Sequence, residues 1–282
     1  MKDFNDKVAV ITGAGSGIGR GLALRLADDG AHLALSDINE TSVKETAELC
    51  RRAGVRVTSA GLDVADKDAM YAHASDVMEN YGRVNLVFNN AGVALGADVI
   101  DMTWEDFEWL MNIDFWGVAY GTKAFLPHLI DSGDAHLVNV SSVFGLMGIP
   151  TQSAYNAAKF AVRGFTESLR QEMRIAKHPV GVTCVHPGGI KTNIVVNARG
   201  MDKVGDPESV NRGFQLMAIT RPDSAARIIL DGVRHNKPRV LIGPDARGFD
   251  LIPRIVGPRY QDIAAPFARI GRNVGERFGL SL

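Results

Sequence analysis

The chain has little of what would mark a secreted, metal-binding or membrane-spanning protein. Its two cysteines, Cys50 and Cys184, are too few for a disulfide framework, so we expect reduced thiols. None of its seven histidines forms a pair at metal-ligand spacing, which predicts no metal site. No apolar run approaches the ~18 residues of a membrane span, and charges occupy the N-terminus where a signal peptide is apolar. We therefore expect a soluble, cytoplasmic protein.

Neither sign of charge dominates the composition. Lys and Arg number 31, Asp and Glu number 32, and the basic residues are spread along the chain. A nucleic-acid partner is therefore not expected. No stretch rich in proline or serine divides the 282 residues, of which 46% are hydrophobic. This composition can bury one large core, so we predict a single domain over residues 1–282.

Short apolar, β-branched runs alternate with longer helical patterns along the chain. The predicted strands lie at 8–11, 33–35, 55–59, 86–88, 137–140, 182–185 and 240–242. The predicted helices lie at 18–29, 41–53, 67–81, 104–129, 153–177 and 223–235. This alternation predicts an α/β fold, with a doubly wound parallel sheet of about seven strands and helices on both faces. Only residues 189–213 and the extension 244–282 lack a regular pattern.

A glycine-rich turn, Thr12-Gly13-Ala14-Gly15-Ser16-Gly17-Ile18-Gly19, follows the first predicted strand and opens the first helix. Such a turn either holds a pyrophosphate on backbone N–H groups or simply joins strand to helix. Asp37 favours the first interpretation, because it ends the second strand about 20 residues on, where an acid bonds the adenosine ribose. Its carboxylate would repel a 2′-phosphate. Since Ser16 and Ile38 carry no charge, NAD is favoured over NADP, and Arg20 is interpreted as a solvated residue of the first helical turn.

Tyr155 and Lys159 share one face of a predicted helix, being four residues apart. An ammonium beside a phenol favours the phenolate, and could bring the pKa of Tyr155 from ~10 toward ~7. Ser142 ends the fifth strand and can donate a hydrogen bond to a substrate oxygen, whereas the adjacent Ser141 points to the opposite face. This set predicts hydride transfer with a tyrosine acid/base.

These motifs, together with Asn89-Asn90-Ala91-Gly92 and Pro187-Gly188, resemble the short-chain dehydrogenase/reductase family from about residue 5 to 192. The resemblance implies a single Rossmann-type domain and a nicotinamide dinucleotide. It implies that Asn112, Ser142, Tyr155 and Lys159 form the catalytic set, in which Asn112 kinks its helix and holds a water leading to the lysine. It also implies that the cofactor is bound by Gly13, Ser16, Gly17, Ile18, Gly19, Asp37, Asp63, Val64, Asn90, Ala91, Gly92, Tyr155, Lys159, Pro187, Gly188, Ile190 and Thr192.

The activity predicted from these features is NAD-dependent hydride transfer to or from an apolar secondary alcohol or ketone. Two alternatives stay open: a dinucleotide-binding sensor or regulator without turnover, and a family epimerase or dehydratase, which usually has a longer substrate segment. Residues 189–213 are predicted to form a substrate lid. The expected pocket is lined by Val93, Leu95, Val143, Phe144, Met147, Ile149, Ile194, Val195, Val196, Phe214 and Met217.

Two further expectations concern assembly and the C-terminal extension. The helices at 104–129 and 153–177 carry excess apolar surface, including Phe107, Leu110, Phe115, Trp116, Phe165 and Leu169, which predicts a homodimer or homotetramer. The extension 244–282 is expected to pack over the substrate mouth or a neighbouring subunit. Membrane contact is the weaker alternative, because acidic residues dilute its arginines.

Overall fold

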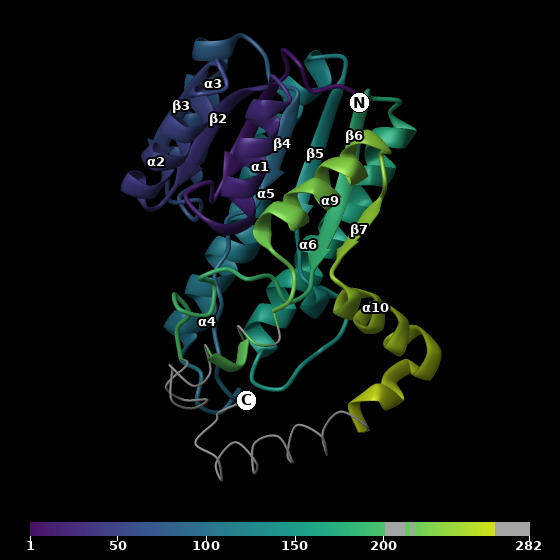
Figure 1. The fold of residues 1–282 in the computed structure, drawn as a ribbon. Coiled ribbons are helices and arrows are strands. Elements are labelled where there is room, and N and C mark those ends of the chain that lie inside the picture. The colour runs from purple at the N-terminus through teal and green to yellow at the C-terminus, as the bar shows by residue number, and fades with distance from the viewer. Residues whose placement is uncertain (201–211, 215, 217, 263–282) are drawn as a thin grey trace.

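The computed structural model describes residues 1–200, 212–214, 216 and 218–262. Part of the predicted lid (201–211), Met217 of the predicted pocket, and residues 263–282 of the extension lie outside the described residues. A single seven-stranded sheet, flanked by helices, makes up the described part of the chain (Figure 1).

All strand pairs of the sheet are parallel, in the order β3-β2-β1-β4-β5-β6-β7. The strand order reverses between β1 and β4, which is where doubly wound sheets bind ligands at the carboxyl ends of their strands. The strands are β1 (Val8–Thr12), β2 (His32–Asp37), β3 (Val57–Gly61), β4 (Leu86–Asn89), β5 (Ala135–Val140), β6 (Val180–Pro187) and β7 (Arg239–Ile242). The predicted fold class is therefore confirmed.

Helices cover both faces of the sheet. In chain order they are α1 (Gly17–Asp28), α2 (Glu40–Arg51), α3 (Lys67–Tyr81), α4 (Trp104–Met111), the π-helical turn η1 (Asn112–Trp116), α5 (Gly117–Asp131), the 3₁₀ turn η2 (Val143–Gly145), α6 (Ser153–Ile175), α9 (Pro222–Arg234), α10 (Pro244–Val256) and the 3₁₀ turn η3 (Gly257–Arg259). Side-chain caps begin several of them: Asn39, Asp66 and Thr103 each accept a backbone hydrogen bond three residues on.

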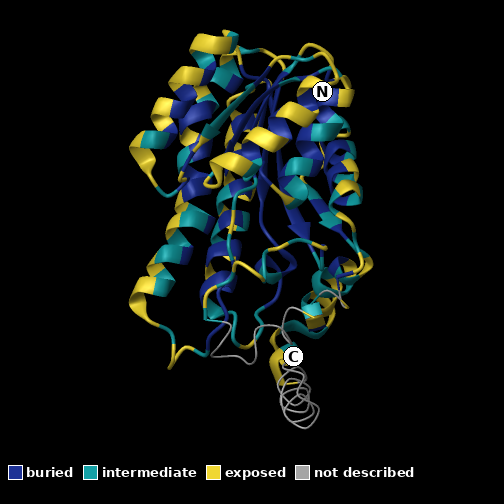
Figure 2. Cartoon of the chain, turned by 60° about the vertical axis from the view of Figure 1, so that its left-hand side comes forward, coloured by how far each residue is buried: buried dark blue, intermediate teal, exposed yellow. Residues whose placement is uncertain are grey.

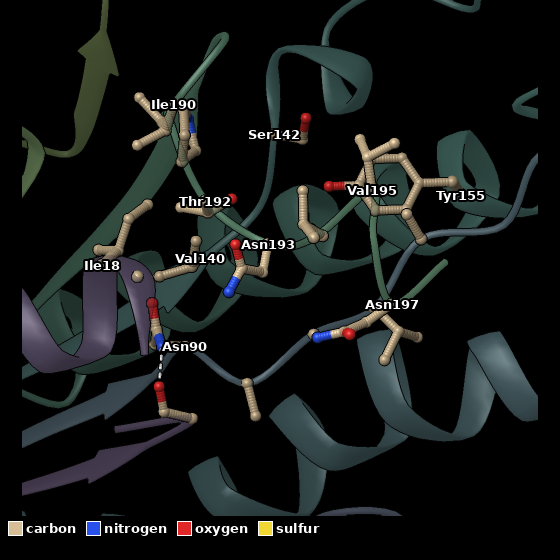
Figure 3. Close-up of a pocket in the computed structure, with 18 of the residues that line it drawn as sticks. Ile18, Asn90, Val140, Ser142, Tyr155, Ile190, Thr192, Asn193, Val195 and Asn197 are labelled. Atoms are coloured by element: carbon tan, nitrogen blue, oxygen red, sulfur yellow. Dashed lines mark hydrogen bonds between the residues drawn. The ribbon is translucent and has the colours of Figure 1, made fainter. Parts of the chain in front are cut away.

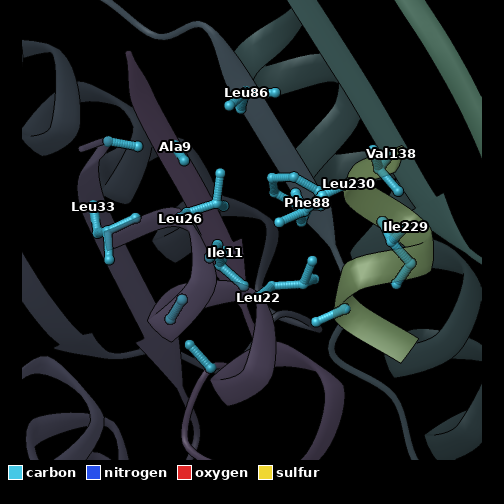
Figure 4. Packing of buried hydrophobic residues seen from close by; sticks show 14 of the residues in the cluster. Ala9, Ile11, Leu22, Leu26, Leu33, Leu86, Phe88, Val138, Ile229 and Leu230 are labelled. Atoms are coloured by element: carbon cyan, nitrogen blue, oxygen red, sulfur yellow. The ribbon is translucent and has the colours of Figure 1, made fainter. Parts of the chain in front are cut away.

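Two apolar clusters attach the helices to the sheet. One joins α1, α2 and α9 to one face, and Leu22, Leu26 and Ile229 lie there against β1 and β4 (Figure 4). The other joins α3, α5 and α6 to the opposite face. Fully burying one such leucine contributes about 2 kcal/mol. Figure 2 shows the result, a buried sheet between helices whose outer faces are exposed.

The structure differs from the sequence prediction in two elements. The helix predicted over 104–129 is interrupted by the π-helical turn η1, a distortion common at functional sites. Residues 244–256, predicted to be irregular, form α10, which Gly243 (φ +100°) and Pro244 begin. In Figure 1, α4 and α10 both lie beyond the lower end of the sheet. No helix within the described ranges is long and apolar enough to cross a membrane.

Candidate active site

One large cavity, of about 1760 Å³, opens at the carboxyl ends of the strands. It extends from Asp37, after β2, to Phe249 on α10. Figure 3 shows Ile18 and Asn90 on one side, Tyr155 and Val195 on the other, and Thr192 and Asn193 between them. Its volume exceeds that of an ordinary drug-sized pocket (~300–1,000 Å³), so it has room for a dinucleotide and a second molecule.

The glycine turn forms the phosphate end of this cavity. Gly13 has φ +65°, and a Cβ there would lie 2.8 Å from the Cα atom of Ala91, so only glycine fits without strain. Ser16 is the N-cap of α1 but makes no capping hydrogen bond with its side chain, and it lines the cavity with Gly17 and Ile18. The first-turn N–H groups of α1 are therefore free of a side-chain acceptor, an arrangement that suits a pyrophosphate.

Polar contacts between β1 and β4 fix this turn. The hydroxyl of Thr12 accepts hydrogen bonds from the backbone N–H groups of Asn90 and Ala91, both at 3.1 Å. The side-chain amide of Asn90 donates to the carbonyls of Thr12 (2.9 Å) and Gly13 (3.2 Å). Gly19 lies behind the turn, where a Cβ would be 2.1 Å from the Gly13 oxygen. Gly19 does not line the cavity, so its predicted contact with the cofactor is corrected to support of the turn.

Asp37 lies at the end of the cavity where the adenosine is predicted to bind. Its carboxylate accepts hydrogen bonds from the N–H groups of Gly15 and Asn39, both at 2.9 Å, which fix its position at the end of β2. Arg20 turns toward α2 instead, where it donates to the Thr46 hydroxyl at 2.9 Å and pairs with Glu45 at 3.3 Å. The guanidinium therefore already has acceptors on α2.

Ser142 and Ser141 point in different directions, as strand alternation predicts. Ser142 caps η2, and its hydroxyl accepts a hydrogen bond from the Phe144 N–H at 3.1 Å. Ser141 donates to the Lys159 carbonyl at 2.8 Å, on the side of α6. Of the two, Ser142 is the one whose hydroxyl lowers the pKa of the Tyr155 phenol.

Tyr155 lies in the first turns of α6 and is 9% exposed. Burial raises the pKa of its phenol, Lys159 lowers it, Asp114 raises it, and the hydrogen bond with Ser142 lowers it, so that the net pKa lies above the ordinary value. The sequence prediction of a lowered pKa is therefore wrong for this structure. It took the lysine charge to act alone, whereas burial and a second charge oppose it.

Lys159 lies beneath the phenol, with its Nζ atom 5.4 Å from the Tyr155 ring centroid. It donates to the Val140 carbonyl at 3.3 Å and forms an ion pair with Asp114 at 3.0 Å. Burial lowers the pKa of Lys159, but Asp114 and Tyr155 raise it by more, so the ammonium stays charged. The side chains of both partners are almost entirely buried.

Asn112 does not reach this cluster. It is exposed at the start of η1, whereas Asp114, two residues later in the same π-helical turn, is completely buried beside the lysine. The prediction that Asn112 contacts the water leading to Lys159 is therefore corrected: Asp114 is the η1 side chain that meets the lysine. A π-helical turn changes which residue of a helix faces inward, so helical periodicity could not show this.

Most of the other predicted cofactor residues line the cavity together. These are Gly13, Ser16, Gly17, Ile18, Asp37, Asp63, Val64, Asn90, Ala91, Gly92, Tyr155, Lys159, Pro187, Gly188, Ile190 and Thr192. Asp63 also forms a local turn, accepting from the Ala65 N–H at 2.9 Å, while the cap of α3 is Asp66. Ser142, Tyr155 and Lys159 thus share one cavity with these predicted cofactor residues.

Comparison with known proteins decides the family. The family model described as short chain dehydrogenase matches residues 7–203. The chain belongs to the short-chain dehydrogenase/reductase family. It is 51% identical over 267 residues to SadH, a Mycobacterium tuberculosis protein named as an oxidoreductase, with 94% of this chain and 96% of that protein covered. It is accordingly an oxidoreductase that acts on CH–OH groups.

Solved structures of the family share the fold. A short-chain dehydrogenase/reductase from Burkholderia phymatum in complex with NAD matches with a TM-score of 0.81 and 31% identity, covering 94% of this chain and 97% of the other. Levodione reductase matches with a TM-score of 0.77 and 28% identity, covering 87% and 98%.

At the substrate end, the sequence prediction found only part of the residues that line the cavity. Val93, Val143, Phe144, Ile149, Ile194, Val195 and Phe214 line the cavity as predicted. Leu95 and Met147 are buried behind it and Val196 points outward, 59% exposed. Sequence reasoning missed the lining residues Trp109, Gln152, Asn193, Asn197, Asp245 and Phe249. Alternating patterns of polarity give no signal for residues brought together by loops.

Helix α10 forms the outer wall of the substrate end. The Phe249 ring lies 5.9 Å from that of Phe144, and the Tyr260 hydroxyl accepts a hydrogen bond from the Gly148 N–H at 3.1 Å. Asp245 accepts from the Gly189 N–H at 2.7 Å, which ties α10 to the loop after β6. The described part of the extension therefore packs over this end of the cavity, while its place over a substrate mouth stays a prediction.

Proposed function

We propose that the protein transfers hydride between NAD and an apolar secondary alcohol or its ketone, with Tyr155 as the acid/base. The observation that carries this proposal is the gathering of Ser142, Tyr155 and Lys159 at one end of a cavity whose other end is closed by Asp37. The fit for a dinucleotide rests on the turn itself, because Ser16, Gly17 and Ile18 line the cavity at the start of α1, where the Ser16 side chain makes no capping hydrogen bond.

The residues divide the chemistry as follows. When bound, the nicotinamide supplies or accepts the hydride. Ser142 donates a hydrogen bond to the substrate oxygen, a type of contact worth about 3 kcal/mol as charge develops there. Tyr155 gives its proton to that oxygen in reduction and takes it back in oxidation. Lys159 stabilises the phenolate that reduction leaves behind. With its raised pKa the phenol holds its proton at neutral pH, ready for reduction.

The composition of the substrate end supports an apolar ligand. Among the described residues, the carboxylate of Asp245 lines this end and would repel an anion. Arg199, a basic residue of the loop after β6, stacks on Trp109 at 4.0 Å and pairs with Asp106 at 3.3 Å. An alcohol with a charged carboxylate or phosphate would therefore have to displace existing contacts.

The loop after β6 is proposed to close over the ligands. Backbone hydrogen bonds hold it at two points, from Lys191 N–H to Thr220 and from Arg199 N–H to Ala94. Between these points Asn193, Ile194 and Val195 line the cavity. Gly188 and Gly189 precede the segment and Gly200 (φ +68°) follows it, so its ends can turn while its middle closes.

The test is turnover of purified protein with a panel of secondary alcohols and ketones, followed by the absorbance of the reduced nicotinamide. We expect activity with apolar substrates and with NAD in preference to NADP. The panel should include matched alcohols with and without a carboxylate. A clear preference for the charged members would contradict the proposed pocket, and binding of NAD without turnover of any member would favour a sensor.

A further inference from the structure

The pairing of Asp114 with Lys159 is the feature of the site that the proposed chemistry does not use. Asp114 has no exposed surface, and its Oδ1 atom accepts a hydrogen bond from the Val93 N–H at 2.7 Å. Its Oδ2 atom lies 3.0 Å from the Lys159 Nζ atom. Gly92 makes this approach possible, because a Cβ there would lie 3.2 Å from Oδ1 and 3.3 Å from Nζ.

We propose that Asp114 is a positioning residue that, as the buried counter-ion of Lys159, divides the lysine charge and moves the ionisation of Tyr155 to higher pH. The expected effect of Asp114 on turnover rests on the proposed function. The expected effect of Asp114 on the pKa of the Tyr155 phenol rests on the ion pair alone.

The negative charge is the part of Asp114 that packing does not explain. An asparagine has nearly the same shape and could accept the same hydrogen bond from Val93 without being charged. Burying a carboxylate is unfavourable unless a cation pairs with it, and here the cation is the lysine that faces the phenol. Burial raises the pKa of Asp114, and Lys159 opposes that rise.

Other groups around the pair do not supply a competing charge. On β6, burial raises the pKa of Cys184 to about 12 and lowers that of His186 to about 4, so both are neutral near pH 7. Further along α6, Arg163 and Glu167 pair with each other at 3.0 Å. On α4, Asp106 pairs with Arg199, and Glu105 and Glu108 are exposed to water. Asp114 is therefore the charged group nearest to the lysine among the described residues that pack around it.

The primary experiment is an ultraviolet titration of the Tyr155 phenol in the full chain. The signal of Tyr155 is obtained by subtracting the same protein with Tyr155→Phe. We expect Asp114→Asn to lower this pKa by about one to two units, because it removes a close negative charge. Glu108→Gln is the matched control: it also removes one carboxylate, but from an exposed position on the preceding helix, and should leave the pKa unchanged.

Two outcomes would overturn the inference. One is an equal Tyr155 pKa in the parent and in a folded Asp114→Asn variant. The other applies if Asp114→Asn does not fold: a Tyr155 pKa in the parent at or below the ordinary ~10 would show that the lysine charge acts undivided.

The second readout is the pH dependence of alcohol oxidation. Its rise toward alkaline pH should begin about one to two units lower in Asp114→Asn, as in the phenol titration. If Asp114 had only a structural role, Asp114→Asn would lower stability without changing the pH profile. That result would also contradict the inference. If no alcohol is turned over by any variant, the proposed function fails, while the phenol titration still decides the role of Asp114.

Discussion

The choice between NAD and NADP offers the sharpest test of the adenosine end. Two N–H groups, from Gly15 and Asn39, hold the Asp37 carboxylate in one position at the end of β2. Two unit charges ~4 Å apart repel by about 4 kcal/mol at an effective dielectric of ~20. Because Asp37 is partly exposed, we take roughly half of this, about 2 kcal/mol, which corresponds to ~30-fold in affinity.

We therefore expect the parent protein to bind NAD at least ~30-fold more tightly than NADP, and Asp37→Ala to narrow the difference. The assay is titration calorimetry with both dinucleotides at one ionic strength. Asp37→Asn separates charge from hydrogen bonding, because it keeps one acceptor and removes the charge. Equal affinities in the parent, or an unchanged ratio in both variants, would refute the reasoning.

Four further outcomes are expected. Tyr155→Phe should abolish turnover while NAD affinity stays nearly intact, whereas Lys159→Ala should lower both turnover and NAD affinity. Activity assays measure the first quantity and titration calorimetry the second. Burial lowers the pKa of His136 to about 3 and of His186 to about 4, so the unfolded state takes up their protons first. Stability should fall below pH ~6.5, by about 2 kcal/mol per histidine at pH ~5, in urea unfolding. Hydrogen exchange of residues 189–200 should slow when NAD and a substrate analogue bind. Unchanged exchange would contradict the proposed closure of this loop. Light scattering at micromolar concentration should give a dimer or tetramer, and a monomer contradicts this.

The surface available for that assembly differs from the sequence prediction. Leu110 and Leu169 are buried in the protomer, whereas Trp116 (45%) and Phe160 (41%) are exposed. Apolar residues on a helix show that it packs against something, but they do not show whether the partner is the sheet or another subunit. The prediction of a dimer or tetramer therefore now rests on these two aromatic side chains together with Trp104 of α4, which is 76% exposed.

The parts of the fold that local chemistry determines were predictable. β1 is buried along its whole length and reads as an unbroken apolar run, and the glycine turn after it follows from steric demand at Gly13. The parts that depend on distant contacts were not. The π-helical turn η1 brings Asp114 inward in place of Asn112, and α10 was obscured by Pro253 within it. The local pattern of apolar and polar residues predicts neither the π-helical turn nor α10.

Because of the position of α10, substitutions that change the substrate wall fall in a different part of the chain from substitutions that change the cofactor-binding and catalytic residues. The residues proposed to hold the dinucleotide and move the proton all precede Gly200. The outer wall of the substrate end comes instead from α10, after residue 243. The Phe249 ring of α10 meets Phe144, which packs edge-on against Tyr155, and Asp245 of α10 is hydrogen-bonded to the loop after β6. Substitutions in α10 that keep Phe249 and Asp245 can therefore reshape the chamber without changing a residue that touches Tyr155 or Asp37. One catalytic scaffold can in this way take different substrates through changes in α10 alone.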